Sequence, residues 1–208
     1  MISAHEALER LREGNRRFVS RQQGRDADPG HSSRPELTEG QEPSAIILGC
    51  SDSRVPAEIV FDQGLGDLFV IRVAGNIVAP SLVGSVEFAA QQLGTRLVVV
   101  LGHSECGVIL AALEVIERPV ENQSPNLQSI IDQVRPVVED TVRTGHGLEP
   151  EDLVRHAVRK NVRASAEYLR HDSEILAGLI ECDGLHVVGA EYSLETGEVD
   201  FFDGVEIK

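Results

Sequence analysis

Three short runs of apolar residues, 45–48, 68–71 and 97–101, constrain the fold of this chain more than any other feature. Each run is too short for a helix and lacks the apolar–polar alternation of a strand with one face in water. Unbroken runs rich in Val, Ile and Leu are typical of parallel strands that are buried on both faces. The sequence therefore predicts a mostly parallel sheet built on these three segments.

Helical patterns separate and follow the apolar runs. They cover 82–93, a segment that begins after Cys106 and ends before Pro119, then 126–143 and 151–177. A further strand is predicted at 185–190, and a turn at 195–198 leads into 199–202 as a hairpin at the sheet edge. Strands that alternate with helices predict an α/β fold, with a mostly parallel central β-sheet flanked by α-helices.

The N-terminal segment predicts a helix followed by a long loop. Residues 3–19 have amphipathic spacing, and Ser3 with Glu6 forms a capping-box pattern. Either the core of the chain or a partner subunit can supply the surface that this helix needs. Residues 20–43 are polar and are interrupted by Gly and Pro, which is typical of a loop. We expect a single domain, with an N-terminal helical arm and loop over 1–40 and an α/β core over 41–208.

Composition limits the classes of partner. A chain of 208 residues with 41% hydrophobic residues can bury a globular core. A net charge of −15 repels nucleic-acid phosphates and anionic lipids, so we expect no nucleic-acid and no membrane partner. The sequence shows no signal-peptide core and no apolar stretch of membrane-spanning length. Its three cysteines form no disulfide pattern, and we expect a cytoplasmic protein with free thiols.

Two polar clusters follow the first and third apolar runs, at 50–54 and at 102–107. The carboxyl ends of parallel strands are where open α/β sheets place their sites. If the two strands are neighbours, Cys50 faces His103 and Cys106. Thiolate sulfur and imidazole nitrogen are zinc ligands, and three protein ligands leave the fourth position open, as in catalytic zinc sites. The sequence therefore predicts one catalytic Zn²⁺ on these three residues.

Asp52 has two possible roles in this cluster. Residues two apart in an extended chain point the same way, so Asp52 lies near the metal and is a possible fourth ligand. Alternatively, Arg54 pairs with Asp52 through a bidentate contact and holds it off the metal, as an acceptor for the proton of the attacking water. Each residue alone has a common structural role, but the combination favours a metal centre. A thiol redox site is less favoured because there is no Cys-x-x-Cys.

The segments 50–56, 66–76, 84–88 and 102–107 together resemble the β-class carbonic anhydrases, with features of their plant-type branch. The resemblance implies zinc on Cys50, His103 and Cys106, and Asp52 with Arg54 as the catalytic pair. It implies reversible hydration of carbon dioxide to bicarbonate and a proton. It also implies a dimer or tetramer with the active site at the subunit interface.

The same resemblance implies a substrate pocket. Its residues are Gln41, Phe69, Ala74, Phe88 and the backbone N–H of Gly107. Phe88 stands where that branch often has Tyr, and Ala74 where it often has Val. Because of these two differences, hydrolysis of carbon disulfide or carbonyl sulfide on the same scaffold is an alternative function. A non-catalytic zinc protein, with Asp52 fixed on the metal, is the other alternative.

Arg72 matches an arginine of the bicarbonate inhibition site that a second branch of the family builds partly on a Trp. This chain has no Trp. We therefore predict no bicarbonate inhibition of that type.

Overall fold

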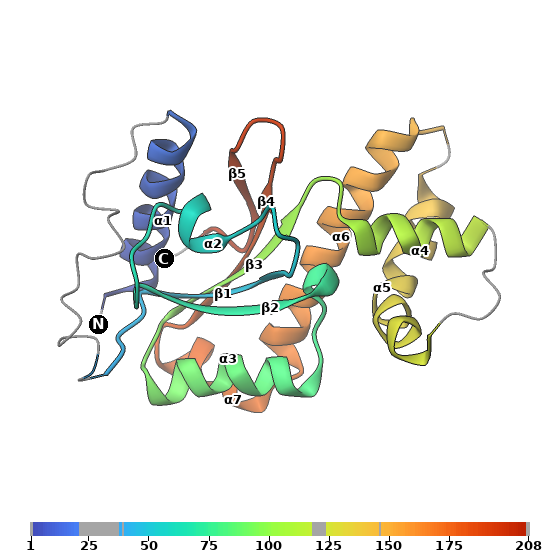
Figure 1. Ribbon diagram of the computed structural model, residues 1–208. Coiled ribbons are helices and arrows are strands. Elements are labelled where there is room, and N and C mark those ends of the chain that lie inside the picture. Colours follow the sequence, from blue (N-terminus) through green and yellow to red (C-terminus); the bar gives the residue numbers. More distant parts are fainter. Residues whose placement is uncertain (1, 21–37, 39, 118–123, 146, 207–208) are drawn as a thin grey trace.

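A five-stranded sheet forms the centre of the computed structural model (Figure 1), which describes residues 2–20, 38, 40–117, 124–145 and 147–206. Its strands are β1 (Ala45–Cys50), β2 (Leu68–Val73), β3 (Leu97–His103), β4 (His186–Tyr192) and β5 (Val199–Asp203). The order is β2-β1-β3-β4-β5, with β5 antiparallel to β4 and every other pair parallel. The predicted α/β fold and the edge hairpin are confirmed. Most of the loop expected over 20–43 lies outside the described residues.

Helices cover both faces of the sheet, because alternate residues of a strand point to opposite sides. The helices are α1 (Ala4–Val19), α2 (Ala57–Val60), α3 (Pro80–Gln92), α4 (Gly107–Glu117), α5 (Pro125–Thr144), α6 (Pro150–His171) and α7 (Glu174–Cys182). Ile47 and Val99 pack with α1 and α2, whereas Ile46 and Val98 pack with α3, α6 and α7 (Figure 1). Every residue of β1 and β3 is buried, as the unbroken apolar runs predicted. The same prediction was wrong for 68–71, because β2 is an edge strand and only its Ile71 is buried. None of the described helices is both long and apolar enough to cross a membrane.

Helix α1 packs on the core of its own chain. Ala4, Leu8 and Leu11 are buried against the sheet, and Ser3 with Glu6 forms the predicted capping box. The buried side chain of Asn15 donates to the carbonyls of Val60 and Gly197 and accepts from the N–H of Val199. These contacts tie the helix to α2 and to the hairpin before β5.

The helical pattern at 151–177 forms two helices instead of one. Helix α6 ends at His171 and α7 begins at Glu174, because the hydroxyl of Ser173 accepts the N–H of Leu176 at 3.2 Å and caps the new helix. The short helix α2 and the 3₁₀ turn η2 (Ala74–Asn76) were not predicted. Both are too short to show a periodic pattern in the sequence.

The direction in which successive strands are added to the sheet reverses between the neighbouring strands β1 and β3. From β1 the chain continues to β2 on one side, and from β3 it continues to β4 on the other side. The connections therefore diverge above the carboxyl ends of β1 and β3. This is the switch point at which open α/β sheets bind their ligands.

Candidate metal centre

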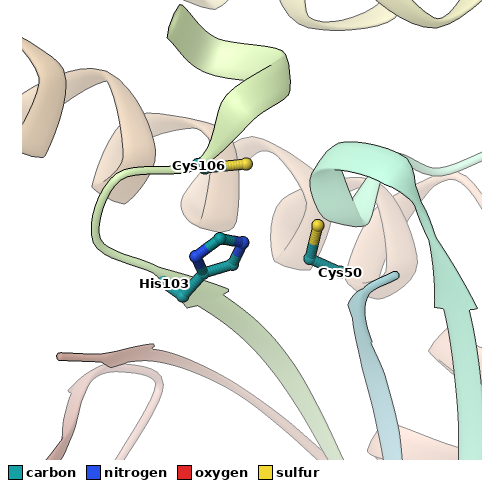
Figure 2. Close-up of side chains that lie close together, drawn as sticks. All are labelled: Cys50, His103 and Cys106. Atoms are coloured by element: carbon teal, nitrogen blue, oxygen red, sulfur yellow. The ribbon is translucent and has the colours of Figure 1, made fainter. Parts of the chain in front are cut away.

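Cys50, His103 and Cys106 meet at this switch point. Cys50 ends β1, His103 ends β3, and Cys106 directly precedes α4. All three are buried, and their ligand atoms lie within 4.8 Å of one another. Figure 2 shows the two sulfur atoms and the imidazole ring turned toward a common point. The predicted cluster is confirmed, because β1 and β3 are neighbours in the sheet.

The imidazole of His103 is oriented for metal binding. Its Nδ1 lies 2.8 Å from the carbonyl oxygen of Ser104, so Nδ1 carries the proton and donates it, which leaves the lone pair of Nε2 free. Nε2 is buried and has no hydrogen-bond partner among the described residues. A buried polar atom without a partner is costly, and a cation bound by this nitrogen would satisfy it.

The thiols of Cys50 and Cys106 shift each other's pKa in opposite directions. Contact with Cys106 lowers the pKa of the Cys50 thiol to about 4 against the effect of burial, and the N–H of Gly75 acts in the same direction. The same contact, together with burial, raises the pKa of Cys106 far above its usual range. Metal binding requires thiolates, so a divalent cation held by the two sulfurs would displace the proton of Cys106.

The Asp52 carboxylate lies at the edge of the cluster, in a bidentate contact with Arg54. Oδ1 of Asp52 accepts from Nε of Arg54 at 2.9 Å, and Oδ2 accepts from Nη2 at 2.7 Å. The side-chain hydrogen bonds from Arg54 hold the pKa of Asp52 well below its usual range. Oδ2 is also 3.9 Å from Nε2 of His103. The expected Asp52–Arg54 pair is therefore present, with an ionised carboxylate beside the ligand atoms.

Two further residues support the cluster and were not recognised as such from the sequence. Nε of Arg72 donates to the carbonyl of Cys50 at 3.0 Å, and its Nη2 donates to the carbonyl of Asp52 at 2.6 Å. Arg72 therefore fixes the backbone that carries both side chains. The N–H of Gly75 donates to Sγ of Cys50 at 3.4 Å. The Gly–Asn pair at 75–76 signals a turn, but no local pattern shows where its N–H points.

Comparison with known proteins identifies the family of this chain. Residues 45–199 match the family model described as carbonic anhydrase. The chain belongs to the carbonic anhydrase family. It is 38% identical over 203 residues to carbonic anhydrase 2 of Mycobacterium tuberculosis H37Rv, covering 96% of this chain and 93% of that protein. It is 35% identical to the carbonic anhydrase of Mycolicibacterium smegmatis, covering 93% and 91%.

Solved structures place the chain in the β-class. The β-carbonic anhydrase CcaA aligns with a TM-score of 0.77 and 28% identity, over 97% of this chain and 90% of that one. The Coccomyxa β-carbonic anhydrase in complex with acetazolamide aligns with a TM-score of 0.72 and 26% identity, over 93% and 87%. The predicted membership of the β-class is confirmed. The plant-type branch remains a prediction.

The residues expected to form the substrate pocket fall into two groups. Ala74 lies in the turn beside Cys50, and Gly107 follows Cys106. Gln41, by contrast, precedes β1, at the opposite end of a strand about 17 Å long. Phe69 pairs with Ile46 at the same far end of β1.

Phe88 belongs with the second group. Its ring contacts that of Phe69, with centroids 6.3 Å apart, and its side chain is half-exposed. Of the five predicted pocket residues, only Ala74 and Gly107 therefore lie close to the candidate metal ligands of the same chain.

Proposed function

We propose that this chain is a zinc-dependent enzyme of the plant-type-like branch that reversibly hydrates carbon dioxide to bicarbonate and a proton. The observation that carries the proposal is the orphaned, buried Nε2 of His103 between two thiols, beside the Asp52–Arg54 pair. Two thiolates and a neutral imidazole balance the charge of Zn²⁺ and match its preferred ligands. Three ligands leave one position for substrate water.

When bound, zinc supplies a Lewis acid that lowers the pKa of water toward neutrality. The Asp52 carboxylate would orient a water molecule at this site by accepting a hydrogen bond from it. Because Arg54 keeps the pKa of Asp52 low, the carboxylate stays ionised and remains an acceptor throughout the neutral pH range. Arg54 fixes the direction of the carboxylate, and Arg72 fixes the backbone beneath it.

A second position of Asp52 closes the site. Its Oδ2 is 3.9 Å from Nε2 of His103, so rotation of the side chain away from Arg54 would bring the carboxylate among the three ligand atoms, where it could bind a metal held by them. Arg54 selects between the two positions, because it holds the carboxylate in the open one. Crystals prepared across a pH series test this through the identity of the fourth ligand. Density for water at every pH contradicts the closed state.

The substrate pocket is completed by a second copy of the chain. Gln41, Phe69 and Phe88 lie at the end of the sheet remote from Cys50, which supports their contribution to the cluster of a partner. The β-carbonic anhydrases of Sordaria macrospora are tetrameric (TM-score 0.74, 25% identity, covering 83% of this chain and 88% of that one). We propose a dimer or tetramer, whose apolar walls suit a molecule without charge or dipole.

Mixed dimers test the shared pocket. A chain with Asp52→Asn and a chain with Gln41→Ala each form defective sites alone. When they are co-expressed, a shared site places both defects in one pocket and leaves the other pocket intact. Random pairing then restores about one quarter of the wild-type activity, because half the dimers are mixed and each has one intact site of two. No recovery in isolated mixed dimers contradicts the shared pocket.

Metal analysis with a stopped-flow hydration assay tests the function itself. We expect one zinc per chain and rapid carbon dioxide hydration. Asp52→Asn should lower kcat by about 10²–10⁴-fold, because the amide no longer acts as a charged acceptor, and should leave zinc bound. Wild-type turnover in this variant contradicts the role of Asp52. Zinc without hydration, or faster turnover of carbon disulfide or carbonyl sulfide in parallel assays, contradicts the proposed activity.

A further inference from the structure

The 3₁₀ turn η2 reaches the metal cluster from the side opposite His103. Gly75 at its centre donates its N–H to Sγ of Cys50. Its backbone is left-handed, with φ 76°, and a Cβ at this position would lie 2.8 Å from Cγ1 of Val108. The turn therefore passes closely between the end of β1 and the start of α4, and only Gly fits at its centre.

The left-handed backbone of the turn includes its last residue as well as its centre. Asn76 also has a left-handed backbone, with φ 43°. Its side chain is buried, and Nδ2 has no hydrogen-bond partner among the described residues. Two successive left-handed residues, one of them not glycine, persist only where the surroundings determine them.

Helix α6 supplies those surroundings. Nδ2 of Asn161 donates to the carbonyl of Gly75 at 2.9 Å, and the hydroxyl of Ser165 donates to the carbonyl of Asn76 at 3.2 Å. The two side chains are four residues apart, so they lie on one face of the helix. Asn161 is only 4% exposed and Ser165 only 3%. Neither residue lies near a site motif in the sequence.

The helix itself is a rigid support. Val162, next to Asn161, packs so closely on β3 that a Cβ at Gly102 would lie 2.6 Å from its Cγ2. Gly102 directly precedes His103. The helix α6, which contacts η2, therefore also packs directly on β3, the strand that carries His103.

We propose that Asn161, assisted by Ser165, is a positioning residue that aims the Gly75 N–H at Sγ of Cys50 and thereby sets the zinc affinity of the cluster. The inference rests on the proposed zinc site. Hydrogen bonds to a ligating atom fix its orientation, and their loss weakens metal binding by about 10–100-fold. Asn161 is not one of the three candidate ligands, and it acts through its hydrogen bond to the backbone of Gly75.

A buried asparagine remote from the cluster provides a matched control. Asn15 is 6% exposed, and its amide also donates to backbone carbonyls, those of Val60 and Gly197. Asn15→Ala and Asn161→Ala therefore make the same chemical change at similar burial. A merely structural role of Asn161 predicts that both variants lose stability and that neither changes the zinc affinity of the folded protein.

The experiment measures the dissociation constant of Zn²⁺ by competition with a chromophoric chelator, for the full chain and for each variant. We expect about 10–100-fold weaker binding in Asn161→Ala and a change within about twofold in Asn15→Ala. In the Co²⁺-substituted proteins, the sulfur-to-metal charge-transfer band should shift only in Asn161→Ala. If that variant does not fold, Ser165→Ala, which removes one oxygen atom, should weaken zinc binding several-fold in the same direction.

Three outcomes separate the claims. Wild-type protein that does not bind zinc contradicts both the proposed function and this inference. Wild-type zinc binding that is unchanged in Asn161→Ala, or in Ser165→Ala where the first variant does not fold, overturns the inference alone. Equal weakening in Asn15→Ala and Asn161→Ala also overturns it, because the effect then follows general destabilisation.

Discussion

Replacement of Gly75 by Ala tests how tightly the turn beside Cys50 is packed. A left-handed backbone costs an L-residue with a Cβ about 1–2 kcal/mol. The new Cβ would also lie 2.8 Å from Cγ1 and 3.0 Å from Cβ of Val108, and overpacking of this kind costs about 1–3 kcal/mol. The sum predicts a loss of about 2–5 kcal/mol in the free energy of unfolding, a large part of the stability of an ordinary domain.

Urea unfolding measures this loss, with chelator present so that weaker zinc binding does not add to it. Gly84→Ala is the control: Gly84 lies inside α3, and a Cβ there meets nothing within 4 Å. That change should stabilise the protein by about 0.5–1 kcal/mol. Val108→Ala in a double-mutant cycle should recover part of the Gly75→Ala loss, because it removes the atom that clashes most closely. An unchanged unfolding midpoint in Gly75→Ala would refute the packing argument.

Three further changes test the electrostatics and packing of the cluster. Because Arg54 lowers the pKa of Asp52, their pairing stabilises the fold above the ordinary carboxyl pKa of about 4, and this contribution is lost as the pH falls through the lowered value. Arg54→Gln should therefore lower the urea midpoint at neutral pH and weaken its fall in acid, so that the two curves converge at low pH; curves that coincide at every pH would contradict this. The pKa of Cys106 is raised, so zinc affinity should increase with pH through neutrality in chelator competition, and an affinity independent of pH would contradict a protonated Cys106 thiol in the metal-free protein. Gly102→Ala, whose Cβ would meet Val162 at 2.6 Å, should cost about 1–3 kcal/mol by urea unfolding, and wild-type stability would show that α6 can move away from β3.

Much of the fold follows from local patterns. The unbroken apolar runs at 45–48 and 97–101 predicted strands buried on both faces, and β1 and β3 are buried at every residue. The pattern at 151–177 shows the limit of periodicity. A single polar side chain, Ser173, ends one helical stretch and caps the next, and the helical spacing on either side hides the break.

The pocket residues show a second limit. Phe69 and Phe88 were expected beside the metal because of the resemblance to a family, and that expectation did not say which chain they serve. The register of β2 against β1 places Phe69 opposite Ile46, far from Cys50 in the same chain. The distance between Phe69 and Cys50 follows from the register of β2 against β1, which is known only from the three-dimensional structure.

The sequence by itself indicated the candidate metal ligands: two apolar runs, each followed by Cys or His side chains, and an Asp–Arg pair two residues apart. The tertiary structure decided how that cluster is held. The bond from Asn161 to Gly75 joins residues 86 positions apart, and the Gly75 N–H reaches Cys50 only because α6 and β1 enclose one turn. The spacing of residues along the chain predicts which side chains lie close together within one helix or strand. Contacts between helices and strands depend on tertiary packing, which local spacing does not predict.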